Sequence, residues 1–414
     1  MKLGINGMGR IGKLSLWTHV ARRSFEGIVV NVGREVGQNL HNLAETLEKD
    51  STYGRLSQYL HGVHGGRVIE NLDEATGSMT IDGMPVRFLR SARNPKEIAW
   101  RENGVRMVVD CTGVFIDPTH SVDAPHGSLR GHLEAGAQKV LLSAPFKIGN
   151  QGLQTPDDAV TCVMGINEEM VLPARHALVS AASCTTTCLA FMMKPLLDHF
   201  GVERILSASM VTVHAATSSQ TVLDAVPASG AKDLRKSRSI MNNIILTTTG
   251  AAKALRLVLP EMAEVGFMAE SVRVPTTTGS LTILTLNLQS ESSERPINRA
   301  DINGIYRDAA QGAYQGYLEY SEDQNVSADI IGHPKAATVI EAQETHTRTA
   351  FIRLNIDRVP GLSPEIHETL NTLPKHILEA PVTQVVVYGW YDNELGSYAN
   401  MLADLTEYVA KQMV

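Results

Sequence analysis

The sequence is poor in cysteine, in aromatic residues and in charge of one sign. Its 414 residues include four cysteines and 5% aromatic residues, and the net charge is −7. Four cysteines are too few for a disulfide framework in a chain of this length, so we expect free thiols and the reducing cytoplasm. The small negative charge gives no reason to expect binding to nucleic acid or to an anionic membrane surface.

Long apolar runs are also absent. No window of about 18 uninterrupted apolar residues occurs, which argues against a membrane-spanning helix. The first residues, Met-Lys-Leu-Gly-Ile-Asn, lack the basic-then-apolar pattern of a signal peptide. A hydrophobic content of 43% is that of an ordinary globular protein. Separately, we predict no metal site in this chain.

Strands and helices alternate in the first part of the chain. The predicted strands are 3–6, 28–32, 105–110 and 139–143. The helices between them are predicted at 10–25, 36–48 and 128–137. This alternation predicts an α/β unit, a doubly wound parallel sheet of the Rossmann type with helices on both faces.

The second part is instead rich in long strands. They are predicted at 205–213, 281–289, 352–357 and 383–388. Apolar and polar residues alternate at 352–357, which is typical of a strand with one covered face. Helices around 185–200, 298–311 and 395–412 would cover a mostly antiparallel sheet, so we predict an α+β unit here.

A glycine motif follows the first predicted strand. Gly7, Gly9 and Gly12 are spaced as Gly-x-Gly-x-x-Gly between that strand and the next helix. In this context Gly7 permits a tight turn, Gly9 admits a pyrophosphate to the backbone, and Gly12 allows close packing of helix on strand. The motif predicts an NAD(P) site at the helix N-terminus, and a glycine-rich turn without a ligand is the alternative.

The end of the second strand bears on the choice of cofactor. NAD-specific sites usually carry an acidic residue there, about 20 residues after the motif, which binds the ribose 2′-hydroxyl. Here the strand runs into Gly33 and Arg34, and the first acidic residue, Glu35, comes later. A missing negative charge next to a cation suits a 2′-phosphate, so the sequence favours NADP over NAD. Alternatively, Arg34 points to solvent or stacks on adenine without discriminating.

A cysteine precedes the helix predicted around 185–200. Cys184 stands in Ser-Cys-Thr-Thr-Thr-Cys, where a helix N-terminus would stabilise a thiolate and the hydroxyls could bind an oxyanion. His214 ends the next strand and could meet Cys184 as a base. Taken alone, one cysteine and one histidine are more often structural. We interpret Cys188, one helical turn later, as a buried packing residue, with a redox relay as the alternative.

Separated segments resemble glyceraldehyde-3-phosphate dehydrogenase and follow the order of that family across almost the whole chain. They are Ile-Asn-Gly-Met-Gly-Arg-Ile-Gly at 5–12, Ser-Cys-Thr-Thr at 183–186, His-Ala-Ala-Thr-Ser-Ser-Gln at 214–220, Thr-Gly-Ala-Ala-Lys-Ala at 249–254, Arg-Val-Pro-Thr at 273–276 and Trp-Tyr-Asp-Asn-Glu at 390–394. Their joint occurrence by chance is negligible, which removes the structural reading of Cys184 and His214.

The resemblance implies roles for matching residues. Cys184 would be the nucleophile and His214 its activating acid–base. With the glycine motif and the strand end included, the predicted cofactor contacts are Gly7, Gly9, Arg10, Ile11, Gly12, Gly33, Arg34, Thr112, Gly113, Ser143 and Asn393. The predicted contacts to the attacking phosphate or the substrate phosphate are Ser183, Thr185, Thr217, Arg238, Thr249, Gly250 and Arg273.

The implied reaction is phosphorylating. Glyceraldehyde 3-phosphate, phosphate and NAD(P)⁺ would give 1,3-bisphosphoglycerate and NAD(P)H through a Cys184 thioester, in glycolysis or gluconeogenesis. The alternatives are an erythrose-4-phosphate dehydrogenase, an aldehyde dehydrogenase that releases the free acid, and a non-catalytic nucleotide-binding paralogue. The resemblance also implies a homotetramer.

Three units are expected along the chain. They are an NAD(P)-binding domain at 1–182, a catalytic domain with insertions at 183–393, and a C-terminal helix at 394–414 that packs back on the first domain. The chain exceeds the usual length of the family, and we place the excess near 117–130, 147–158, 226–231 and 343–382. Thr187 replaces the asparagine of the family, and Tyr398 is displaced by one position.

Overall fold

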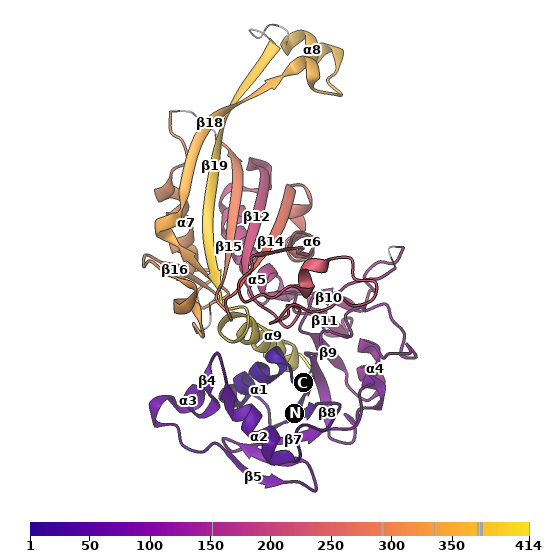
Figure 1. The fold of residues 1–414 in the computed structure, drawn as a ribbon. Coiled ribbons are helices and arrows are strands. Elements are labelled where there is room, and N and C mark those ends of the chain that lie inside the picture. Colours follow the sequence, from indigo (N-terminus) through magenta and orange to yellow (C-terminus); the bar gives the residue numbers. More distant parts are fainter. Residues whose placement is uncertain (151, 291–293, 335, 371, 373–375, 414) are drawn as a thin grey trace.

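The N-terminal part of the chain forms a doubly wound sheet. The structure is a computed structural model that describes residues 1–414 except 151, 291–293, 335, 371, 373–375 and 414 (Figure 1). Within these residues the sheet has the order β10-β11-β9-β8-β1-β2-β7-β6-β5. Its strands are β1 (Lys2–Asn6), β2 (Gly27–Asn31), β5 (Ile69–Asp73), β6 (Ser78–Ile81), β7 (Met84–Leu89), β8 (Val105–Asp110), β9 (Lys139–Leu142), β10 (Ala159–Thr161) and β11 (Leu178–Ser180).

Parallel pairing dominates this sheet. Among the strands that the structure describes in it, only β5–β6 and β6–β7 pair antiparallel, and this meander was not predicted because β5 is short and largely exposed. The helices of this part are α1 (Arg10–Arg22), α2 (Leu40–Glu48), α3 (Leu56–His61) and α4 (Leu129–Glu134), and a small pair of strands, β3 (Lys49–Asp50) and β4 (Gly54–Arg55), lies between α2 and α3. The predicted Rossmann-type α/β architecture is confirmed.

Helix α1 ends earlier than predicted. Its apolar side chains, including Leu14 and Trp17, are fully buried against the sheet. Arg23 then adopts the left-handed conformation, with φ of 56°, and its N–H bonds to His19 O at 3.0 Å. The helix therefore ends at Arg22, three residues before the predicted end at Phe25.

The second sheet is mostly antiparallel, as predicted. Its order is β13-β14-β12-β15-β19-β17-β16, with β18 also paired to β19, and within it only β12–β14 and β16–β17 are parallel among the described residues. The strands are β12 (Ile205–Ala215), β13 (Ile245–Thr247), β14 (Gly266–Val274), β15 (Ser280–Gln289), β16 (Leu318–Ser321), β17 (Thr338–Glu341), β18 (His346–Asn355) and β19 (Ile377–Tyr391). The helices are α5 (Cys184–Phe200), α6 (Ala251–Val258), α7 (Arg299–Gln311), α8 (Pro364–Leu370) and α9 (Asn400–Lys411).

We call the parts of the molecule that are built on the first and the second sheet the first unit and the second unit. One face of the second sheet forms the core of the second unit. Along β15 every second residue is buried, and Leu284, Leu286 and Leu288 have no exposed surface. They pack in one apolar cluster with Phe191 of α5 and Leu255 of α6. The period of two and the helices over one face therefore agree with the α+β expectation.

The hairpin β18–β19 departs from the prediction. Residues 352–357 were expected to have one covered face, but Ile352 and Leu354 are 40% and 47% exposed, and Asp357 lies in a 3₁₀ turn after the strand. The reason is the register: β15 ends at Gln289, opposite Val382, so the outer part of the hairpin has no neighbouring strand. It protrudes from the body with α8 near its tip (Figure 1).

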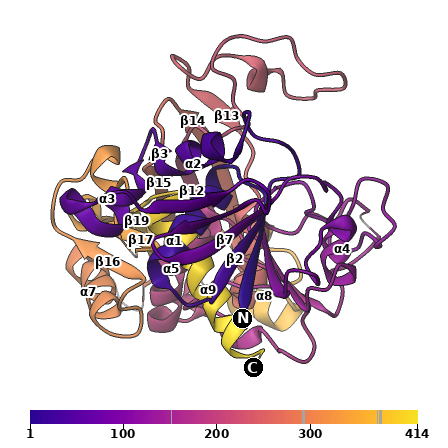
Figure 2. The same cartoon turned by 90° about the horizontal axis from the view of Figure 1, so that it is seen from below.

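The C-terminal segment returns to the first unit. A π-helical turn at Leu395–Ala399 precedes α9, and Arg22 of α1 pairs with Asp404 of α9. A Cβ on Gly396 would meet His333 O at 2.2 Å, so a close backbone crossing accompanies this irregular turn. Viewed from below, the two chain ends lie near each other, and the segment between β12 and β13 extends away from the body (Figure 2). Of the helices in the described ranges, none is long and apolar enough to cross a membrane.

Candidate active site

Cys184 is the first residue of α5. Ser183 caps this helix, and its hydroxyl oxygen accepts from Thr186 N at 3.1 Å. The chain turns sharply from β11 into the helix at Ala182, whose φ is 53°. Burial raises the pKa of the Cys184 thiol, and the positive charge of Arg273 acts in the opposite direction.

His214 lies beside Cys184 at the end of β12. Its Nε2 is 3.5 Å from Cys184 Sγ, and the residue is only 4% exposed. Burial and then the charge of Arg273 lower the pKa of His214 to about 4. The imidazole is therefore neutral near neutral pH, which is the state that can take a proton from a thiol.

Arg273 lies beside His214 because the parallel strands β12 and β14 pair these two residues. Its Nη1 contacts His214 Nδ1 and donates to Ala215 O at 3.1 Å. Its buried Nε has no hydrogen-bond partner, and no carboxylate of the described residues pairs with the guanidinium. Burial lowers the pKa of Arg273, but a guanidinium keeps its charge. An unpaired cation next to a nucleophile can hold an anionic group of a substrate.

Tyr391 lies next to Cys184 and His214, and sequence reasoning assigned it no role. Its hydroxyl lies 2.9 Å from Thr185 Oγ1 and 2.8 Å from Thr212 Oγ1, and its ring centroid lies 6.0 Å from that of His214. Because the Thr185 hydroxyl is engaged in this buried contact, the backbone N–H of Thr185 is the group better placed for the predicted anion.

The other predicted anion-binding residues lie in separate places. Thr217 bonds Gln220 through its hydroxyl at 3.0 Å, and Thr249 Oγ1 accepts from Ala251 N at 3.2 Å next to Gly250, the cap of α6. Arg238 is paired with Asp224, and its side chain is 64% exposed. The roles predicted for these residues stay predictions.

A cleft of about 410 Å³ lies at the carboxyl ends of the central strands. It is lined by Asn6, Gly7, Asn31, Val32, Gly33, Arg93, Asn94, Thr112, Val114, Phe115, Pro125 and His126. A Cβ on Gly12 would meet Gly7 O at 2.0 Å, and nothing lies within 4 Å of a Cβ on Gly9. The loop is thus tight where the helix packs and open where a pyrophosphate would approach, so the residues fit a dinucleotide.

Two arginines near this cleft differ from expectation. Arg34 is exposed and does not line the cleft, whereas Arg93 lines it and donates to Gly33 O at 3.2 Å. The side chain of Arg10 is engaged elsewhere, in ion pairs with Asp50 and Glu394. Arg10 can therefore offer a cofactor its backbone, while its side chain ties the two units together.

A buried polar network orients the cleft, and the sequence did not reveal it. Asp110 accepts from Asn6 Nδ2 at 2.7 Å, from Thr112 Oγ1 at 2.7 Å and from Thr112 N at 3.0 Å. His132 Nε2 lies 3.0 Å from the same carboxylate, and Trp100 donates to His132 Nδ1 at 2.9 Å. These contacts hold Thr112, a predicted cofactor contact, in one orientation. Of the other predicted contacts, Gly113 has φ of 67°, Ile11 and Ser143 are partly buried, and Ser143 N bonds Asp110 O at 2.9 Å.

Asn393 follows β19 by two residues, and hydrogen bonds to its amide oxygen fix its side chain. Its Oδ1 accepts from Ser280 Oγ at 2.9 Å, and Ser280 Oγ in turn accepts from Ala215 N at 3.0 Å. Within the described part of the chain the amide nitrogen donates to no residue. A fixed amide with a free donor suits the carboxamide oxygen of a nicotinamide.

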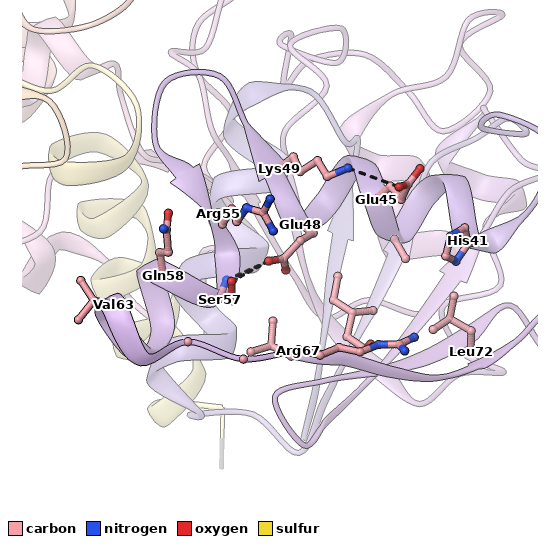
Figure 3. Close-up of a pocket in the computed structure, with 15 residues that line it drawn as sticks. His41, Glu45, Glu48, Lys49, Arg55, Ser57, Gln58, Val63, Arg67 and Leu72 are labelled. Atoms are coloured by element: carbon pink, nitrogen blue, oxygen red, sulfur yellow. Dashed lines mark hydrogen bonds and ion pairs between the residues drawn. The ribbon is translucent and has the colours of Figure 1, made fainter.

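A second cavity lies away from all of these residues. It has a volume of about 590 Å³ and lies between α2, α3 and the segment at 62–72 (Figure 3). In it Ser57 Oγ donates to Glu48 at 2.8 Å, and Lys49 pairs with Glu45 at 3.4 Å. None of the predicted site residues lines this cavity. The described residues hold no cluster of three or more His, Cys, Asp and Glu that could bind a metal ion.

Fold and site together define a class. A dinucleotide-binding sheet joined to a domain with a cysteine–histidine pair is the arrangement of an NAD-binding oxidoreductase. The family model for the glyceraldehyde 3-phosphate dehydrogenase NAD binding domain matches residues 1–118, and that for its C-terminal domain matches residues 183–355. The chain belongs to the glyceraldehyde 3-phosphate dehydrogenase family.

Curated relatives agree over the whole length. Glyceraldehyde-3-phosphate dehydrogenase 2 of Streptomyces avermitilis is 35% identical, and the alignment covers 100% of this chain and 99% of the relative. Glyceraldehyde-3-phosphate dehydrogenase 1 of Bacillus subtilis is 34% identical with the same coverage. The glyceraldehyde-3-phosphate dehydrogenase of Geobacillus stearothermophilus is also 34% identical, again over 100% of this chain and 99% of the relative. The resemblance predicted from the motifs is confirmed, and it includes a nicotinamide dinucleotide as the class of cofactor.

Proposed function

We propose that this protein oxidises glyceraldehyde 3-phosphate in the presence of inorganic phosphate and yields 1,3-bisphosphoglycerate. The observation that carries the proposal is the unpaired guanidinium of Arg273 beside Cys184 and His214. A site for an unphosphorylated aldehyde gains nothing from a half-buried cation without a counterion, whereas a phosphate monoester would supply the missing acceptor.

The residues on hand provide each protein step of this reaction. His214 Nε2 takes the thiol proton, Cys184 Sγ adds to the aldehyde carbon, and the proton passes from Nε2 to the former carbonyl oxygen to give a thiohemiacetal. His214 then removes the hydroxyl proton while the carbon–hydrogen bond breaks. A bound nicotinamide supplies the chemistry of a hydride acceptor at this point. A phosphate oxygen attacks the resulting thioester, the carbon–sulfur bond breaks, and the Cys184 thiolate leaves as the acyl phosphate forms.

For the cofactor we propose NADP, with NAD as the alternative. The strand end carries Val32 and Gly33 where an NAD site usually has an acidic residue, and Arg93 borders the same cleft. Arg93, rather than Arg34, is therefore the cation that we expect to meet a 2′-phosphate. Asn31 also lines the cleft, and its buried Oδ1 is an acceptor without a partner for a ribose hydroxyl.

A cofactor-resolved assay tests the proposal. Formation of NADH and NADPH from glyceraldehyde 3-phosphate is measured with and without phosphate, with arsenate as a surrogate. We expect turnover that requires the oxyanion, a higher kcat/KM with NADP, and no turnover by Cys184→Ser. Activity without any oxyanion would instead indicate release of the free acid, and an equal or higher kcat/KM with NAD would refute the NADP preference.

Two further comparisons separate the remaining alternatives. A higher kcat/KM with erythrose 4-phosphate in the same assay would identify that sugar as the substrate. Failure of both aldehydes, together with slow labelling of Cys184 by iodoacetamide, would favour a non-catalytic paralogue.

We also propose a cytoplasmic homotetramer, as the resemblance implies, and sedimentation equilibrium of the purified chain measures the assembly.

A further inference from the structure

We propose that the cavity between α2, α3 and residues 62–72 binds a purine nucleoside monophosphate whose base carries an exocyclic amino group. The cavity is separate from the dinucleotide cleft, because no residue lines both. The nucleotide would therefore bind at the same time as the cofactor. The inference goes beyond the proposed function and does not depend on which aldehyde the protein oxidises.

The size and the apolar walls of the cavity suit a base and its sugar. Its volume of about 590 Å³ lies within the range of about 300–1,000 Å³ that is usual for small-molecule sites. Its aliphatic lining consists of Ala44, Val63, Val68, Ile69 and Leu72. Val63 is 91% exposed, so a flat ring in the cavity would cover an apolar side chain that now lies in water.

Glu48 of α2 supplies an acceptor that the fold leaves unused. Its Oε1 accepts from Ser57 Oγ at 2.8 Å, whereas its buried Oε2 has no hydrogen-bond partner among the described residues. A buried carboxylate oxygen without a donor is destabilising, and an N–H group of a ligand would relieve this. Because the bond from Ser57 holds the carboxylate, Oε2 can accept from an exocyclic amino group without rearrangement.

Two arginines at the cavity can hold a phosphate. Arg67 donates through Nε to Ile69 O at 3.0 Å, and Arg55 is the cap residue of α3. In the part of the chain that the structure describes, neither guanidinium pairs with a carboxylate. A guanidinium binds phosphate oxygens through charge-assisted and often bidentate hydrogen bonds.

The acceptor and the cations lie on different walls of the cavity. Glu48 belongs to α2 and Arg67 to the segment 62–72, and no ion pair joins these two described side chains (Figure 3). A ligand that meets both must carry its amino group and its anionic group at opposite ends of an apolar body. A purine nucleoside monophosphate has this order, whereas an α-amino acid carries both groups on one carbon.

Isothermal titration calorimetry with AMP and IMP tests the proposal. The two nucleotides differ at position 6 of the purine, where AMP has an amino group and IMP has a carbonyl oxygen. Excess NAD and NADP keep the dinucleotide cleft filled during the titration. For the native protein we expect AMP to bind about tenfold or more tightly than IMP, because IMP places an oxygen against Oε2 of Glu48.

Glu48→Gln should reverse this preference. The amide keeps an oxygen for Ser57 and presents an NH₂ group in place of Oε2, so it can donate to the carbonyl of IMP and meets the amino group of AMP donor to donor. We expect the ratio of the two Kd values to shift by about 10–100-fold in favour of IMP. An unchanged preference for AMP would overturn the assignment of Glu48.

Arg67→Gln should weaken both nucleotides about tenfold or more and leave their ratio unchanged, because both carry the same phosphate. Arg348→Gln is the matched control, since Arg348 is an exposed arginine of β18 that does not line the cavity, and it should bind both nucleotides as the native protein does. The proposal is overturned if AMP does not bind while the cleft is filled, if the native protein does not distinguish AMP from IMP, or if Arg67→Gln binds as the control does.

Discussion

Asp392 offers the sharpest test of how the two units are held together. This carboxylate is 2% exposed and accepts five hydrogen bonds. Oδ1 accepts from Tyr53 Oη at 2.7 Å, from Thr278 Oγ1 at 2.8 Å and from Glu394 N at 2.9 Å. Oδ2 accepts from the backbone N–H groups of Gly332 and Gly396, each at 2.9 Å.

Asp392→Asn preserves the shape but removes one acceptor. If the NH₂ group takes the place of Oδ2, it faces two backbone N–H groups and breaks both hydrogen bonds. If it takes the place of Oδ1, the two hydroxyls can turn and accept from it, and only Glu394 N loses its acceptor. Each hydrogen bond to a charged group contributes about 1.5–3 kcal/mol, so the free energy of unfolding should fall by about 1.5–6 kcal/mol. The neighbouring Asn393 would lose its support, so the affinity for the dinucleotide should fall as well.

Urea unfolding of the variant, followed by tryptophan fluorescence and circular dichroism, measures the loss. Asp123→Asn is the control, because the side chain of Asp123 is 89% exposed and pairs on the surface with Lys96. That control should stay within about 1 kcal/mol of the native protein. If Asp392→Asn is as stable as the control, the reasoning about the five donors is refuted.

Three further outcomes are expected. His214→Asn should lower kcat by about 10²–10⁴ in the aldehyde assay, as loss of an acid–base group does, and near-normal turnover would contradict that role. Arg93→Ala should weaken binding of NADP by about 10–100-fold and of NAD by less than about threefold, and an equal loss for both would show that Arg93 does not meet the 2′-phosphate. Burial, then the charge of Arg22, lowers the pKa of His19 from 6.5 to about 3. The unfolded chain therefore binds more protons between these values, and this part of the stability is full above 6.5 and is lost as the pH falls toward 3. His19→Leu should flatten the fall of unfolding free energy with falling pH, and an unchanged slope would count against this account.

The periodic parts of the chain were predictable because their residues report their own surroundings. Alternation at 281–289 marks a strand with one buried face, and the glycines at 7, 9 and 12 mark a tight turn into a helix. The same reasoning was wrong for Ile352 and Leu354. Alternation shows which face of a strand could be buried, but β15 ends before it reaches the outer part of the hairpin, so these side chains stay exposed.

The candidate site likewise combines features that the sequence indicates with features that only the packing decides. The motifs around Cys184 and His214 singled out both residues as candidates before any geometry was known, since short-range sequence places one at a helix start and the other at a strand end. Their separation of 3.5 Å, however, follows from how α5 packs against the sheet that contains β12. The sequence also offered Arg34 as the cation near the cofactor, whereas the fold lines the cleft with Arg93, about 60 residues later, because β7 lies next to β2.

The sequence by itself therefore determined the family and the two kinds of sheet and singled out the cysteine and histidine that we propose as the reactive pair, because each of these depends on local patterns and spacings. The tertiary structure alone decided which charges meet. It placed Arg273 against His214 by strand register, left that guanidinium without a carboxylate, and joined Tyr53, Thr278 and Asp392 from distant parts of the chain. Such encounters depend on how elements pack, and no local pattern records them.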